Sequence, residues 1–166
     1  MEKKRGKNEW RSGCPLNASV EMLGDQWSLL IIRDMMLRGS RTFTEFLDSY
    51  EMIASNVLAD RLRRLEANRI LTRERDAKDR RKQIYRLTEK GIDLGPVLTE
   101  MVLWAAAHEE TENAALVRKM RKDKKGFLAE IRQRWAVVTG QAGGKRVRPG
   151  QSPKHEERTS GRASGG

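Results

Sequence analysis

The chain has 166 residues, and 34 Lys and Arg against 23 Asp and Glu give it a formal net charge of +11. No stretch has the roughly 18 consecutive apolar residues of a transmembrane helix, and the basic first residues lead into no apolar signal segment. One cysteine and two distant histidines exclude a disulfide framework and a zinc cluster, so we expect a cytoplasmic protein without metal, cofactor or membrane contact, whose first partner to test is nucleic acid.

The positive charge is concentrated in one stretch of the chain. Residues 54–90 carry a net charge of +6, whereas residues 15–53 carry −3 and residues 91–110 carry −4. A phosphate is attracted by the local electric field of the protein more than by the net charge of the whole chain. The concentration of positive charge in one stretch therefore favours a phosphate-binding face. A solvated basic surface would have the same composition.

Apolar residues spaced three and four apart predict helices in the first half of the chain. Residues 1–13 are polar and are expected to form a flexible basic arm. A helix over residues 55–68 would bury one leucine stripe: Leu58, Leu62 and Leu65. Helix starts, breaks and caps are expected at Pro15, Gly24, Gly39 and Thr42 or Thr44.

The periodicity then changes to that of strands. Residues 70–74 and 82–87 favour two strands joined by a polar turn. Thr88 opens a helix that Gly95-Pro96 should bend or restart, and a last amphipathic stretch is interrupted near Gly126.

This order of elements predicts a mainly α fold with a small β-hairpin. It is the order of a winged helix-turn-helix DNA-binding domain, which we place at residues 14–108. A C-terminal extension of dimerisation helices would follow at residues 109–139, and the Gly-rich residues 140–166 are expected to be a disordered basic tail.

Burying the leucine stripe leaves a polar face on the helix over residues 55–68. Its candidates for contacting bases are Ser55, Asn56, Ala59, Asp60 and Arg63. A helix N-terminus favours anions, and Asn can pair with adenine through two hydrogen bonds. An ordinary surface helix would have the same polarity, and Arg61 and Arg64 could equally pair with Asp60 and Glu66.

The predicted hairpin indicates nucleic-acid binding more strongly than the polar helix face does. Arg80, Arg81 and Lys82 cluster at its turn, where cations can reach phosphates or a minor groove. We add Arg41 as a further phosphate contact, and Asp79 could brace a neighbouring arginine. Because helix and hairpin occur together, phosphate contact is favoured over simple solvation.

Several ordered motifs resemble the HxlR-type bacterial transcriptional regulators: Cys14-Pro15-Leu16, GDQWSLLII at 24–32, RTFTEF at 41–46 and YRLT at 85–88. The resemblance covers about residues 14–108, and the wing is also similar to that of MarR-type regulators. It implies a homodimer that binds DNA and represses or activates genes. Ala54 and Arg69 depart from the family's usual Ser and Gly, so Ser55 would cap the helix and Asn68 would supply the left-handed turn.

The resemblance also draws attention to Cys14, because many HxlR-type relatives have a cysteine there and some sense oxidants or electrophiles through it. Arg11 and the basic arm would favour the reactive thiolate. A lone cysteine could form an intersubunit disulfide or take up an adduct. The alternative is a small, partly buried residue without a regulatory role.

The helix that follows the hairpin carries an apolar stripe that the domain is too small to cover. We expect it to pair with a second copy through Leu94, Leu98, Met101 and Trp104. A two-fold dimer would place two reading helices about 34 Å apart, which matches a pseudo-palindromic operator. Ile131 and Trp135 could extend this interface or fold back on the domain.

Enzymatic motifs are missing from the sequence: it has no glycine-rich phosphate loop, no HExxH and no Gly-x-Ser-x-Gly. The sequence therefore predicts a sequence-specific regulator of double-stranded DNA that acts as a homodimeric repressor, and the resemblance adds Cys14 as a candidate sensor of oxidants or electrophiles. The alternative is a winged-helix protein-interaction module that does not bind DNA. The sequence indicates no effector.

Overall fold

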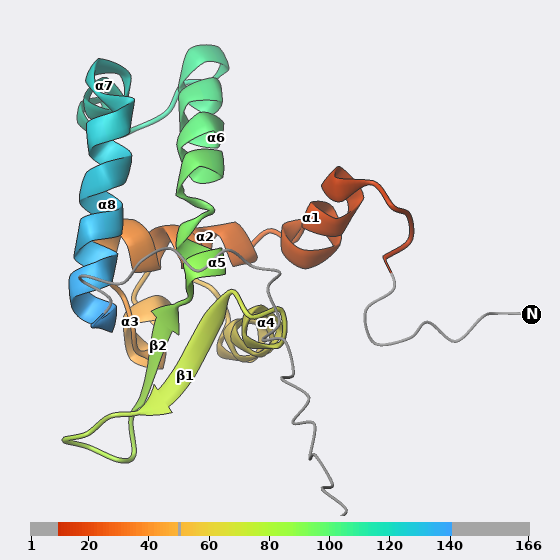
Figure 1. Cartoon of the computed structure of the whole chain (residues 1–166), viewed down its shortest axis with the longest axis vertical. Helices are drawn as coiled ribbons and strands as arrows, with labels where there is room; N and C mark the ends of the chain where they lie inside the picture. The colour runs from red at the N-terminus through yellow and green to blue at the C-terminus, as the bar shows by residue number, and fades with distance from the viewer. Residues whose placement is uncertain (1–9, 50, 141–166) are drawn as a thin grey trace, which may run out of the picture.

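Helices and one hairpin follow each other in winged-helix order in the computed structural model, which describes residues 10–49 and 51–140 (Figure 1). The elements are α1 Pro15–Leu23, α2 Ser28–Arg33, the π-helix η1 Asp34–Arg38, α3 Phe43–Leu47, α4 Ser55–Ala67, β1 Leu71–Arg75, β2 Gln83–Leu87, α5 Glu89–Ile92, α6 Gly95–His108, α7 Ala114–Lys122 and α8 Lys124–Thr139. The predicted mainly α class with a β-hairpin is confirmed. Most of the expected arm at 1–13 and almost all of the expected tail at 140–166 lie outside the described residues.

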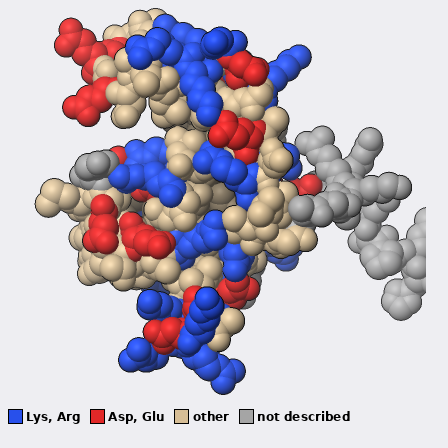
Figure 2. Space-filling model, turned by 90° about the vertical axis from the view of Figure 1, so that its left-hand side faces the viewer, with Lys and Arg blue, Asp and Glu red and all other residues tan. Residues whose placement is uncertain are grey.

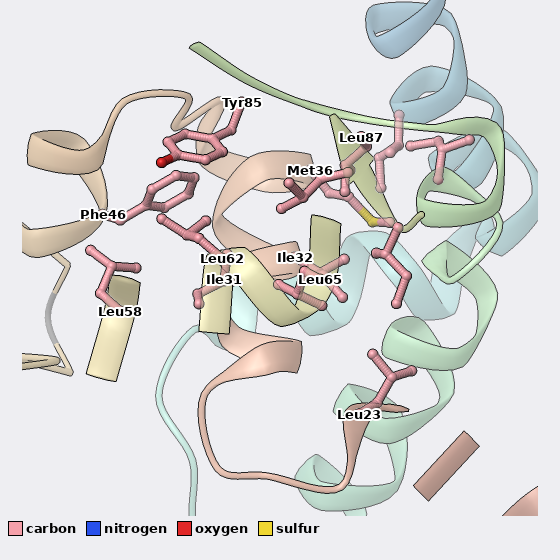
Figure 3. Close-up of a cluster of buried hydrophobic side chains, with 14 of the residues drawn as sticks. Leu23, Ile31, Ile32, Met36, Phe46, Leu58, Leu62, Leu65, Tyr85 and Leu87 are labelled. Atoms are coloured by element: carbon pink, nitrogen blue, oxygen red, sulfur yellow. The ribbon is translucent and has the colours of Figure 1, made fainter. Parts of the chain in front are cut away.

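The leucine stripe of α4 forms the centre of the core (Figure 3). Leu58, Leu62 and Leu65 are at most 2% exposed and belong to one cluster with residues of α2, α3 and the hairpin. Above them, the rings of Phe46 and Tyr85 meet edge to face, with centroids 6.1 Å apart. One face of α4 is therefore fixed against the body, and the opposite face points outward.

Hydrogen bonds of the backbone fix the hairpin to the rest of the domain. β1 and β2 pair antiparallel, with Leu71 opposite Leu87, and each strand begins one residue later than predicted. The backbone N–H of Tyr85 donates to the carbonyl of Arg41 at 2.8 Å, which ties β2 to the segment before α3. The hairpin is thus held at its base while its tip is left to project (Figure 1).

The end of α4 differs from the prediction. Arg69, not Asn68, adopts the left-handed conformation, with φ 57°. The N–H groups of Arg69 and Ile70 donate to the carbonyls of Glu66 and Leu65, at 2.9 Å each. This is the Schellman pattern, in which the left-handed residue comes directly after the C-cap, and Asn68 occupies the C-cap itself.

The start of α4 also differs from the prediction. Ser55 is already the first helical residue, and Ala54 is the N-cap, with no side-chain hydrogen bond. Ser55 therefore cannot cap the helix, because a capping residue must have the extended backbone that Ala54 adopts here.

A buried carboxylate joins η1 to the turn that precedes α4. Asp34 is 3% exposed and accepts hydrogen bonds from the Arg33 guanidinium, at 2.8 and 3.0 Å, and from the Ser49 hydroxyl, at 2.9 Å. Arg33 also donates to Glu51 at 2.6 Å, and this hydrogen bond lowers the pKa of Glu51 to about 2. The pairing compensates the desolvation of a buried charge.

The C-terminal helices form an arm at the opposite end from the hairpin tip (Figure 1). The break between α7 and α8 falls at Asp123, not near Gly126 as predicted. The Asp123 carboxylate caps α8 by accepting from the N–H of Gly126 at 2.8 Å, and a Cβ on Gly126 would lie only 2.0 Å from that carboxylate. A side chain at this position would require the Asp123 carboxylate to move.

Helix α8 folds back on the winged-helix domain. Ile131 is buried, and the indole N–H of Trp135 donates to the carbonyl of Leu87 at 2.8 Å. Of the two predicted alternatives for Ile131 and Trp135, packing on their own domain is therefore the observed one. None of the helices within the described ranges is long and apolar enough to cross a bilayer.

Candidate nucleic-acid interface

The outer face of α4 carries the residues that the sequence nominated for base contact. Ser55, Asn56, Ala59 and Arg63 are exposed, and Asp60 is half-buried. They occupy the first three turns of the helix, and its N-cap Ala54 is exposed as well. Unpaired N–H groups give that end of the helix a partial positive charge that suits a phosphate.

Ion pairs on α4 separate the arginines that face outward from those that face the body. Arg63 is 72% exposed at its side chain and donates to Asp60 at 3.2 Å. Arg61 is mostly buried and lies 3.3 Å from Asp60 and 3.5 Å from Asp25. An exposed pair is worth little in water, so Arg63 can exchange Asp60 for another partner, whereas Arg61 is held against Asp25 in the turn before α2.

Arg41 lies where the segment before α3 meets the hairpin. The Glu45 carboxylate accepts from the backbone N–H groups of Arg41, at 2.6 Å, and of Thr42, at 2.9 Å. Thr42 completes the capping box by accepting from the N–H of Glu45, as the predicted cap at Thr42 requires. The half-buried Arg41 is thereby held between α3 and β2. Of the predicted phosphate contacts, it alone does not belong to the hairpin.

Two aspartates shape the hairpin tip and offset only part of its positive charge. Asp76 accepts from the backbone N–H groups of Lys78 and Asp79, at 2.6 and 3.0 Å. Arg81 is 91% exposed and donates to Asp79, and this hydrogen bond lowers the pKa of the Asp79 carboxyl. Arg80, Arg81 and Lys82 are all exposed on the ordered loop, and Figure 2 shows Lys and Arg side chains gathered at this end of the molecule.

Helix α4 and the hairpin lie next to each other, at the opposite end of the molecule from α7 (Figure 1). The sequence did not predict that Met52 would be exposed. Met52 is 85% exposed in the turn before α4, with φ 52°. Its apolar chemistry is typical of a core residue, so the sequence held no signal for its exposure.

Cys14 and the predicted dimer residues lie away from this interface. Cys14 is exposed and is the N-cap of α1, and the neighbouring Arg11 pairs with Glu21 at 3.5 Å, so its charge is shared. Of the predicted dimer residues, Leu94 and Leu98 are half-buried against the chain's own core, whereas Met101 and Trp104 are exposed. Leu16 and Val20 of α1 and Val97 of α6 are further exposed apolar residues.

Comparison with known proteins places this geometry in a family. The HxlR-like helix-turn-helix family matches residues 22–113. The HTH-type transcriptional regulator YodB of Bacillus subtilis is 39% identical over 93 residues, which cover 55% of this chain and 82% of YodB.

Solved structures agree with this assignment. Redox regulator HypR in its oxidised form has a TM-score of 0.52 and 28% identity, covering 59% of this chain and all of HypR. YodB of B. subtilis in its reduced form has a TM-score of 0.50 and 36% identity, covering 61% of this chain and all of that chain. These relatives are regulators and not enzymes, as the sequence predicted. The chain belongs to the HxlR-like helix-turn-helix family of transcriptional regulators.

Proposed function

We propose that the protein is a homodimeric repressor that binds double-stranded DNA in a sequence-specific way and responds to oxidants or electrophiles. The observation that carries the proposal is the exposed polar face of α4 beside a cationic hairpin, at one end of the domain. A helix of this kind fits the major groove while a hairpin reaches the adjacent backbone. Its site of action would be chromosomal DNA in the cytoplasm.

In this proposal the two elements have different tasks. The residues of α4 would contact base edges: Ser55, Asn56, Ala59, Asp60 and Arg63. Arg41 and the hairpin cations Arg80, Arg81 and Lys82 would contact phosphates. Base-edge contacts carry sequence information, whereas phosphate contacts fix position and make binding sensitive to salt. Asp60 would also orient Arg63 through the ion pair described above.

The exposed apolar residues of α1 and α6 support a dimer. α8 covers one side of α6, and Figure 1 shows α1 extending from the body on the other side. Trp104 is 65% exposed, and Leu16, Val20, Val97 and Met101 are exposed with it. Pairing this face with a second copy would bury it and place two α4 helices on successive turns of a pseudo-palindromic operator.

The redox relatives support the proposed role of Cys14. HypR is a redox regulator with an oxidised form, and YodB has a reduced form. Cys14 is exposed at the N-terminus of α1, so its thiol is accessible to an oxidant or electrophile. With one cysteine per chain, oxidation by diamide would join two thiols from different subunits into a disulfide.

DNA binding is tested with the duplex upstream of the protein's own gene and a random duplex, each titrated at several salt concentrations by fluorescence anisotropy. Arg81→Ala should weaken binding to both duplexes alike, because it removes one phosphate contact. For the same reason, the slope of log affinity against log salt concentration should become shallower by about one. Asn56→Ala should weaken binding to the upstream duplex alone, by about 1–3 kcal/mol, because it removes a base contact.

Arg118→Ala is the matched control, since it removes the same charge from α7 at the other end of the molecule. It should leave both affinities unchanged. Equal losses on both duplexes for Asn56→Ala would contradict its base-reading role. A dimer that binds neither duplex at low salt would instead favour a protein-interaction module.

The dimer face is tested by Trp104→Asp, followed by sedimentation analysis. The variant should sediment as a monomer at concentrations where the unchanged protein is a dimer, because an unpaired carboxylate cannot be buried in an apolar interface without a large cost. Val137→Asp places the same change on α8 at another exposed apolar residue and should remain dimeric. A dimeric Trp104→Asp protein would refute this interface.

Oxidant sensing is tested by Cys14→Ser. Diamide should change the duplex affinity of the unchanged protein and produce a band of twice the chain mass in non-reducing electrophoresis. The serine variant should show neither effect, because it has no thiol to oxidise. An identical response to diamide in both proteins would remove Cys14 from the account.

A further inference from the structure

A cavity of about 460 Å³ lies between η1, β2 and α8, at the junction of the winged-helix domain and the C-terminal arm. Two hydrogen bonds hold its walls together. The Trp135 indole donates to the carbonyl of Leu87 at 2.8 Å, and the Arg86 guanidinium donates to the carbonyl of Val138 at 3.0 Å. The cavity is therefore a built feature of how α8 docks, and α8 lies beyond the residues that match the family.

The lining of this cavity combines an apolar interior with cations. Met36, Ile92 and Ile131 are buried residues that line it. Four arginines from different elements also line it, and no Asp or Glu does: Arg38, Arg41, Arg86 and Arg134. A low-dielectric wall beside several positive charges attracts anions strongly.

The arginines are not all neutralised by neighbouring acids. Arg86 pairs with Glu74, and Arg38 lies 3.7 Å from Asp34. Arg41 lies close enough to Glu45, and Arg134 to Glu130, for their charges to interact, but neither arginine forms a direct ion pair among the residues that the structure describes. These two guanidinium groups can therefore accept an anionic partner without breaking an existing pair.

We propose that this cavity binds a small organic anion, with an apolar or aromatic body in the interior and a carboxylate or sulfonate at the arginines. Its volume lies within the range of about 300–1,000 Å³ that small-molecule sites occupy. The backbone adds a second indication, because the π-helix η1 forms part of the wall, and such segments occur frequently at functional sites. The segment after α8 is a poorer occupant, since residues 141–166 carry six cations and two acids.

The cavity shares Arg41 with the proposed DNA interface. An anion in the cavity would compete with a DNA phosphate for the Arg41 guanidinium, and it would also change how β2 is held against α8. Occupancy therefore lowers DNA affinity, a consequence that rests on the proposed function, whereas anion binding itself does not.

Anion binding is tested without DNA, by titrating the full-length protein with 8-anilinonaphthalene-1-sulfonate and following fluorescence. Its matched control is N-phenyl-1-naphthylamine, which has the same aromatic body but no sulfonate. We expect saturable binding of one sulfonate probe per chain and at least about fivefold weaker binding of the neutral compound, because the charge-assisted hydrogen bonds are lost.

Two pairs of variants locate the site. Arg134→Gln should weaken binding of the sulfonate probe about three- to tenfold. Arg118→Gln, on α7 outside the cavity, should not change its binding. Val137→Glu places a negative charge, like that of the sulfonate, at an exposed lining residue and should also weaken binding of the probe. Ala129→Glu places the same charge at an exposed residue of α8 outside the lining and should leave binding unchanged. Thermal unfolding of each variant confirms that it is folded.

Equal binding of the two compounds, or equal losses in both members of each variant pair, would overturn the proposed site, because the probe would then report general surface binding. In a second arm, the probe should weaken binding to the upstream duplex in the unchanged protein, and less so in Arg134→Gln. Probe binding without any effect on duplex affinity would overturn the coupling alone. Failure of DNA binding itself would overturn the proposed function and leave the anion site standing.

Discussion

The buried leucine stripe of α4 is the constraint on which the rest of the molecule depends. Leu58, Leu62 and Leu65 are almost fully withdrawn from water, and together they fix the rotation of α4 about its own axis. Burial of each such side chain is worth about 1.5–3 kcal/mol, so rotating the helix to hide its polar residues instead would cost several times that amount. The outward direction of Asn56 and Arg63 follows from this packing and needs no interaction of their own.

The hairpin depends on the same core, since Tyr85 and Leu87 of β2 are buried in it. Its base is held by the bond from the Tyr85 N–H to the Arg41 carbonyl, and its tip is ordered by Asp76 and Asp79. The acidic residues of the tip therefore do not simply offset its charge. They organise the loop on which the cations stand, so that cations and reading helix have a fixed relation to one another.

Features set by local chemistry could be predicted from the sequence: the leucine periodicity of α4, the break at Gly24 and the restart at Gly95-Pro96. Features set by tertiary context could not. Arg69 is left-handed because the chain must turn from α4 into β1, and α8 starts directly after Asp123 because the carboxylate of this residue caps the helix. Exposure of Met52 and the half-burial of Leu94 and Leu98 depend on neighbours distant in sequence. The cavity is created only where α8 meets β2, about fifty residues earlier in the chain.

The claim that two copies present these elements to one duplex is tested most directly by hydroxyl-radical footprinting of the protein on the DNA upstream of its own gene. A two-fold dimer whose α4 helices enter successive major grooves predicts two protected patches on one face of the duplex, centred about 34 Å apart. Further protection should lie outside each patch, where the hairpins reach the backbone. A single patch, or uniform protection without phasing, would contradict the account.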